Sequence, residues 1–158
     1  MPVDCTFSTP EGVFNYRVGA VIRRGCTLLA MKEEGLSHWY LPGGRVRLHE
    51  PAEQALAREI GEELFLPCRV ERPLWLCENF FPLNGRQVHE LCLYFLVELE
   101  HSALPPGENF LLPDSDGELH QYHWFTEEEL RQAVLYPSFL KEEWPSLPQG
   151  LELRSIRD

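Results

Sequence analysis

The chain has 158 residues, a formal net charge of −11 and a hydrophobic content of 44%. This length suits one domain that buries a core without cross-links, so we expect a single domain over residues 1–158. The acidic balance excludes the usual nucleic-acid binder, because such proteins need a basic surface over the phosphates.

The N-terminal residues, the apolar segments and the cysteines indicate where the protein is expected to be located. The first residues contain no basic stretch followed by an apolar run, and no apolar segment approaches the length of a membrane span. The cysteines are scattered without C-x-x-C spacing, which is typical of reduced thiols inside the cell. We therefore expect a cytoplasmic protein that has no membrane partner.

The first half of the chain is expected to begin with a hairpin. Apolar and β-branched residues predict strands at 13–24 and 26–32, joined by a tight turn at Gly25. Residues 1–12 contain proline and glycine, so they are expected to be irregular. A polar loop then leads to a Pro-Gly-Gly turn at 42–44.

A second hairpin is expected after the middle of the chain. Residues 68–81 have an extended pattern, and Asn84-Gly85 is a strong hairpin-turn signal before a strand at 88–100. Both faces of this last strand are apolar, which indicates a central strand covered on both sides.

The remaining elements mix helices with strands. Thr126 and Glu129 have the spacing of a helix-starting capping box. The expected order is a long loop at 101–118, a strand at 119–126, a helix at 127–135, a short helix at 138–143 and a surface tail after Pro145. This mixture predicts an α/β fold whose mixed β-sheet is covered on both faces.

The segment 50–64 is predicted to be a helix with an unusual buried stripe. Its apolar residues recur every four positions, and Glu59 and Glu63 fall on that same stripe. Burying carboxylates without partners is costly, and Glu62 lies close to both in sequence. A divalent cation would offset this repulsion, and carboxylate-only ligands favour Mg²⁺ or Mn²⁺.

A solvated acidic face is the alternative interpretation of this helix. The helical positions of Glu59 and Glu63 on the buried stripe argue against this interpretation. The Gly43-Gly44 turn argues against it as well, because it lets the backbone approach a ligand or offer a carbonyl to a metal. Arg58 has the spacing to orient a carboxylate bidentately, although an ordinary exposed arginine is also compatible with the pattern.

The stretch from Gly44 to Leu66 resembles the signature of the Nudix hydrolases, G-x5-E-x7-R-E-U-x-E-E-x-G-U, in which U is apolar. The residues that match at the correct spacing are Gly44, Glu50, Arg58, Glu59, Ile60, Glu62, Glu63 and Leu66. The resemblance implies a Nudix-type α/β/α sandwich with a mixed β-sheet. It also implies Mg²⁺-dependent hydrolysis of a diphosphate linkage in a nucleoside diphosphate joined to another group.

The chain departs from the family pattern at three positions. Phe65 stands where the family has a glycine that ends the helix in a left-handed turn, so a different exit from the helix is expected. Arg47 and His49 replace a glutamate and a glycine that are frequent in the family's loop. These changes leave the R-E-x-x-E-E core intact.

The resemblance assigns roles to residues inside and outside the motif. It implies that the catalytic group comprises Glu59, Glu62, Glu63, Arg58 and Glu50. The implied metal ligands are Glu59, Glu62, Glu63, the Gly43 carbonyl and Glu90, the last of which has Glu108, Asp114, Asp116 and Glu118 of the long loop as alternatives. The predicted substrate contacts are Arg17 to phosphate, Gly44 by close backbone approach, and Trp39 and Phe80 by stacking on a base.

The sequence leaves the substrate and the assembly open. An ADP-ribose-like compound or a nucleotide sugar is the first expectation, and nucleoside triphosphate pyrophosphohydrolysis is the second. Dinucleoside polyphosphates, a non-catalytic nucleotide-binding module and a purely structural acidic helix are further alternatives. Dimers are common in the family, so a homodimer is an alternative to a monomer.

Overall fold

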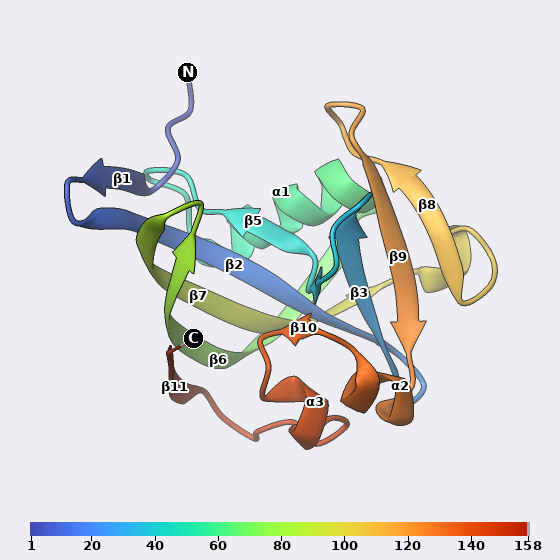
Figure 1. Ribbon diagram of the computed structural model, residues 1–158. Coiled ribbons are helices and arrows are strands. Elements are labelled where there is room, and N and C mark those ends of the chain that lie inside the picture. Colours follow the sequence, from blue (N-terminus) through green and yellow to red (C-terminus); the bar gives the residue numbers. More distant parts are fainter. Residues whose placement is uncertain (158) are drawn as a thin grey trace.

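A mixed β-sheet runs through the computed structural model, which describes residues 1–157 (Figure 1). Its main path has the order β10-β4-β3-β2-β7-β6-β11, with β1 and β5 paired to β2 and the β8–β9 hairpin paired through β9 to β3. The strands are β1 (Thr6–Thr9), β2 (Gly12–Arg24), β3 (Thr27–Glu33), β4 (Trp39–Tyr40), β5 (Gly43–Arg45), β6 (Cys68–Leu83), β7 (Arg86–Leu99), β8 (Asn109–Pro113), β9 (Leu119–Phe125), β10 (Leu135–Tyr136) and β11 (Glu152–Arg157). Because β2–β7, β4–β10 and β6–β11 are parallel and the other pairs antiparallel, the predicted mixed sheet is confirmed.

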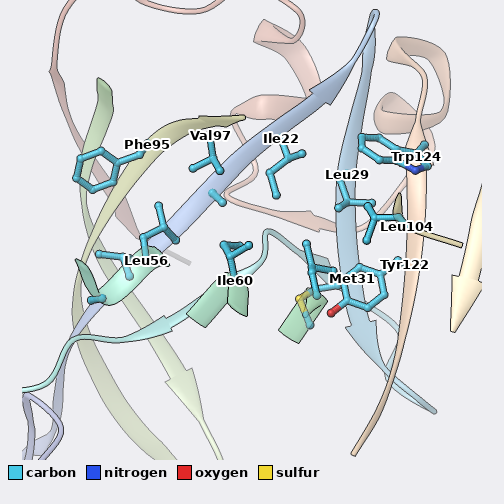
Figure 2. Close-up of a cluster of buried hydrophobic side chains, with 14 of the residues drawn as sticks. Ile22, Leu29, Met31, Leu56, Ile60, Phe95, Val97, Leu104, Tyr122 and Trp124 are labelled. Atoms are coloured by element: carbon cyan, nitrogen blue, oxygen red, sulfur yellow. The ribbon is translucent and has the colours of Figure 1, made fainter. Parts of the chain in front are cut away.

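Helices cover both faces of this sheet, which confirms the predicted α/β/α arrangement. The helix α1 (Ala52–Leu64) packs Leu56 and Ile60 into one core, which Figure 2 shows with side chains of β2, β3, β7 and β9. The helices α2 (Glu127–Gln132) and α3 (Leu140–Glu143) place Leu130 and Leu140 in a second core on the opposite face.

The long strand β7 separates the two cores. Phe95 and Val97 belong to the core beneath α1, whereas Tyr94 and Leu96 belong to the core beneath α2 and α3. Since β7 lies between β2 and β6, its successive side chains point alternately into the two cores. The prediction of a central strand covered on both sides is confirmed.

Both ends of the chain form strands that the sequence did not predict. Within residues 1–12, β1 pairs antiparallel with β2, and in the tail β11 pairs parallel with β6. The irregular structure predicted for residues 1–12 is wrong, because β1 forms a hairpin with β2 that satisfies the backbone groups of both strands. The tail lies on the surface as expected, and there β11 pairs with the otherwise free edge of β6. The composition of a segment does not indicate which strand it will pair with.

The segments around β9 also differ in detail. The loop at 101–118 contains a 3₁₀ turn, His101–Ala103, and strand β8. The capping box of Thr126 and Glu129 is confirmed, but α2 ends at Gln132 instead of residue 135. The chain after it forms β10, which gains backbone partners in β4.

Phe65 and His49, which replace glycines of the family motif, both adopt the positive φ angle that glycine favours. Phe65 follows α1 with φ 57° and ψ 31°, and its amide donates to the Gly61 carbonyl. His49 has φ 68°. The expectation of a different helix exit is therefore wrong, because Phe65 itself adopts the left-handed turn, at the cost in strain that a side chain brings to this region.

Candidate metal and catalytic site

A cavity of about 220 Å³ opens between α1, the β5 turn and the β8–β9 turn. It brings together Glu59, Glu62 and Glu63, which the helical phase predicted to share one side of α1. The residues that line it are Arg17, Met31, Glu33, Tyr40, Gly43, Glu59, Glu62, Glu63, Asp114, Ser115, Asp116, Glu118 and His120.

Glu63 is the most deeply buried of the glutamates in the cavity, with 7% of its surface exposed. Its Oε1 accepts a hydrogen bond from the Gly43 amide at 3.2 Å, and its Oε2 is buried without a hydrogen-bond partner among residues 1–157. Burial raises the pKa of Glu63 well above the usual range, and the nearby Glu59 carboxylate raises it further. An ionised Glu63 therefore requires a positive partner.

Glu59 reaches the cavity because Gly44 has no side chain. A Cβ added to Gly44 would overlap the carboxylate carbon and both oxygens of Glu59. Burial also raises the pKa of Glu59, although its hydrogen bond from Arg58 opposes that change. The Gly-Gly turn thus provides space for the carboxylate, and close approach of a ligand to Gly44 stays a prediction.

Arg58 fixes the carboxylates of Glu50 and Glu59. Its Nε and Nη2 donate to the two oxygens of Glu50 at 2.7 and 2.9 Å, and its Nη1 donates to Glu59 Oε1 at 2.8 Å. Nη2 also donates to the Arg45 carbonyl at 3.0 Å. Glu50 further accepts from the Arg47 amide, so the loop that departs from the family pattern is tied to the same network.

The donor set fits a divalent cation. Glu59, Glu62 and Glu63 offer hard oxygen donors, and the buried Oε2 of Glu63 has no partner within the described chain. Desolvation of the carboxylates is the cost that a bound Mg²⁺ or Mn²⁺ would offset. Gly43 contributes its amide to Glu63, and its carbonyl stays a predicted further ligand.

Arg17 and Glu90 come from neighbouring strands, β2 and β7. Arg17 lines the cavity, whereas Glu90 is not among the lining residues identified in the described chain. Burial raises the pKa of Glu90, an effect that the Arg17 guanidinium and the Asn79 amide oppose. Glu90 is therefore a partly buried neighbour of Arg17 outside the described cavity lining, and its role as a metal ligand stays a prediction.

Trp39 and Phe80 lie outside the cavity lining as the described residues define it. Trp39 packs edge-on against Phe125, with ring centroids 5.0 Å apart. Phe80 packs against His89 on β7 at 4.6 Å. Both rings have partners within the fold, so contact with a base stays a prediction for each.

Sequence reasoning missed Tyr40, Ser115 and His120 as cavity residues. The Ser115 amide donates to the Glu62 carbonyl at 3.1 Å, which fixes the β8–β9 turn against α1. His120 lies on the same side of β9 as the buried Tyr122 and Trp124. Glu59 and Glu63 were predicted as site residues because they are polar residues on an apolar face. The same criterion applied to the alternating pattern of β9 would have identified His120.

Gly44→Ala is expected to reduce metal-dependent turnover about 100-fold or more while leaving the fold intact. The new methyl group displaces the Glu59 carboxylate, and misplacing a catalytic group by about 1 Å costs this much. Turnover and thermal unfolding measured on one preparation check both parts. Gly61→Ala on the same helix has open space around its Cβ and is the matched control, so equal losses in the two variants would contradict the assignment.

Stability of the metal-free protein is expected to fall as pH rises from about 4.5 through the raised pKa values of Glu59 and Glu63. In this window the unfolded chain releases protons that the folded state retains, so ionisation favours unfolding. Urea unfolding in EDTA between pH 4.5 and 8 measures the slope. Glu63→Gln should flatten it, and an unchanged slope in that variant would refute ionisation of Glu63 as its cause.

Comparison with known proteins agrees with the fold and the motif. The model of the NUDIX domain matches residues 13–149. A putative mutator protein MutT4 of Mycobacterium tuberculosis (strain CDC 1551 / Oshkosh) is 31% identical over 119 residues, which are 75% of this chain and 41% of that protein. A putative 8-oxo-dGTP diphosphatase 2 of the same organism is 45% identical over 53 residues, or 31% of this chain and 38% of that protein.

Among solved structures, a MutT NUDIX hydrolase from Burkholderia pseudomallei superposes with a TM-score of 0.59 at 26% identity. The match covers 84% of this chain and 98% of that one. This chain belongs to the Nudix hydrolase family. It spans less than half the length of the two curated relatives from Mycobacterium tuberculosis.

No helix in residues 1–157 combines the length and apolar character needed to cross a bilayer.

Proposed function

We propose that the chain hydrolyses a diphosphate linkage in a nucleotide, with Mg²⁺ or Mn²⁺ held by Glu59, Glu62 and Glu63. The observation that carries this proposal is the buried Oε2 of Glu63, which has no hydrogen-bond partner within residues 1–157 and lies beside two further carboxylates. A helix with a purely structural role is not expected to bury a carboxylate there, because the hydrogen bond from Gly43 compensates only part of the desolvation cost.

The residues around the cavity divide the work of binding and positioning. A bound divalent cation would neutralise phosphate oxygens and lower the pKa of an attacking water. Arg17 faces the cavity with a positive charge suited to phosphate. Arg58 and Glu50 hold Glu59 in place, and Gly43 holds Glu63. The water oxygen bonds to phosphorus as the bridging P–O bond breaks, which leaves two phosphate products.

The first substrate class is a nucleoside diphosphate joined to another group, such as an ADP-ribose-like compound or a nucleotide sugar. A cavity with one arginine and several carboxylates suits the diphosphate of these compounds once a cation is bound. The second class is nucleoside triphosphates, and the named activity of the 8-oxo-dGTP diphosphatase relative favours it. A cytoplasmic location and a homodimer belong to this proposal as expectations.

A hydrolysis screen distinguishes these classes. The purified chain is incubated with ADP-ribose, nucleotide sugars, dNTPs including 8-oxo-dGTP, and dinucleoside polyphosphates, each with Mg²⁺ or Mn²⁺. Phosphorus NMR then reports two monophosphates from the first class, or a monophosphate with pyrophosphate from the second. Equal turnover in EDTA would refute metal dependence. Tight binding of one nucleotide without turnover would favour the non-catalytic module instead.

A further inference from the structure

The turn that joins β8 to β9 has one carboxylate oxygen fixed and another directed at a histidine. Asp114 Oδ1 accepts hydrogen bonds from the amides of Asp116 and Glu118 at 2.8 and 2.9 Å. Asp114 Oδ2 lies 3.9 Å from His120 Nδ1. The backbone of the turn therefore holds Asp114 in one orientation and leaves its second oxygen available to a ligand.

His120 supplies an independent observation at the same place. It has only 6% of its surface exposed, and Nδ1 is buried with no hydrogen-bond partner among residues 1–157. An imidazole nitrogen in this state loses its hydration without replacement, which is unfavourable. A metal ion bound to the Nδ1 lone pair would remove that cost.

The distances suit a shared ion. One ligand atom each from Asp114, Glu118 and His120 lies within 4.8 Å of the other two. A cation with bonds of about 2.1 Å places its ligands about 3–4 Å apart, so a small movement of the exposed Glu118 side chain closes the set. No residue of this group comes from α1.

We propose that Asp114, Glu118 and His120 form a second cation site, separate from the α1 glutamates, which takes a first-row transition-metal dication. The imidazole nitrogen distinguishes it from the oxygen-only set, since nitrogen donors favour these metals over Mg²⁺. The site lies at the β8–β9 turn, which lines the same cavity as the α1 glutamates and which the Ser115 amide ties to α1. Figure 1 shows this turn beside α1. A cation there adds positive charge facing Glu62 and Glu63 and rigidifies the turn. This inference does not depend on the proposed hydrolysis.

Pulsed EPR of added Mn²⁺ tests the site, because it detects a coordinated imidazole through coupling to ¹⁴N. We expect ¹⁴N coupling in the unmodified protein that persists when excess Mg²⁺ removes Mn²⁺ from the glutamates. His120→Asn should abolish the coupling, and Glu118→Gln should raise the Kd for the nitrogen-coupled Mn²⁺ at least about tenfold. Absence of coupling at saturating Mn²⁺ would overturn the proposal and leave His120 paired with Asp114.

Two variants separate this site from its surroundings. His123→Asn changes a histidine on the same strand that contacts Asn109 and Glu129, and it should keep the coupling. Glu63→Gln alters the α1 set and should keep it as well. Coupling that survives in His120→Asn, or disappears in Glu63→Gln, would refute a separate site. Circular dichroism of each variant confirms folding, and the Glu118→Gln titration gives a test that leaves the buried histidine untouched.

Discussion

The Glu63→Gln variant is expected to lose about 10³-fold in metal-dependent turnover while its metal-free form becomes more stable than the unmodified protein. The amide keeps the size of the side chain and an acceptor for the Gly43 amide, but it removes the buried negative charge. Loss of a ligand that stabilises transition-state charge costs a rate factor of this order. Removing a buried charge favours folding by at least about 1 kcal/mol, or about 2–4 °C in Tm.

Turnover, Mn²⁺ affinity and thermal unfolding in EDTA measure these opposite effects. Glu53→Gln is the control, because Glu53 is an exposed acid in the first turn of α1. It should change turnover and Tm little. If Glu63→Gln retained full turnover, the assignment of Glu63 to the metal set would be wrong, and a lower metal-free Tm would contradict the argument from burial.

Arg58→Ala is expected to destabilise the fold by about 2–4 kcal/mol and to weaken metal binding about 10–100-fold. The side chain of Arg58 is 19% exposed and that of Glu50 is 15% exposed, so the bidentate pair is largely shielded from water. The variant leaves Glu50 without its partner and releases Glu59. Arg58→Lys should recover little, because an ammonium group cannot donate to both Glu50 oxygens and Glu59 in this geometry.

Urea unfolding and Mn²⁺ titration check this expectation. Arg131→Ala is the matched control, since Arg131 pairs with Glu127 on the exposed surface of α2 and should cost less than about 1 kcal/mol. Similar losses in the free energy of unfolding of the two arginine variants would show that the Arg58 network stabilises the fold no more than a surface ion pair does. Full recovery in Arg58→Lys would show that charge matters and that bidentate geometry does not.

Helical phase carried the prediction of the site on α1 because its information is local. Glu59 and Glu63 recur with Leu56 and Ile60, and the structure places all of them on the inner side of the helix. Alternation likewise predicted β7 as a central strand, since its two faces enter two cores. A residue's spacing within one element is set by backbone geometry, so sequence suffices for it.

Contacts between elements depend on packing that no single segment encodes. The fold packs Trp39 on Phe125 and Phe80 on His89, contacts that the sequence did not predict, and stacking of either ring on a base stays a prediction. Residues of the β8–β9 turn reach α1 across about fifty positions through the bond from Ser115 to Glu62, a separation that leaves only a weak local signal.

The sequence by itself determined the family motif, the face of α1 that carries the buried carboxylates and the mixed α/β class, because each follows from periodicity or fixed spacing within one stretch. Only the tertiary structure decided that β1 and β11 join the sheet, that Phe65 adopts a left-handed turn, and that His120 faces the cavity. Those outcomes depend on which edges are free and which groups lose water when distant segments pack together.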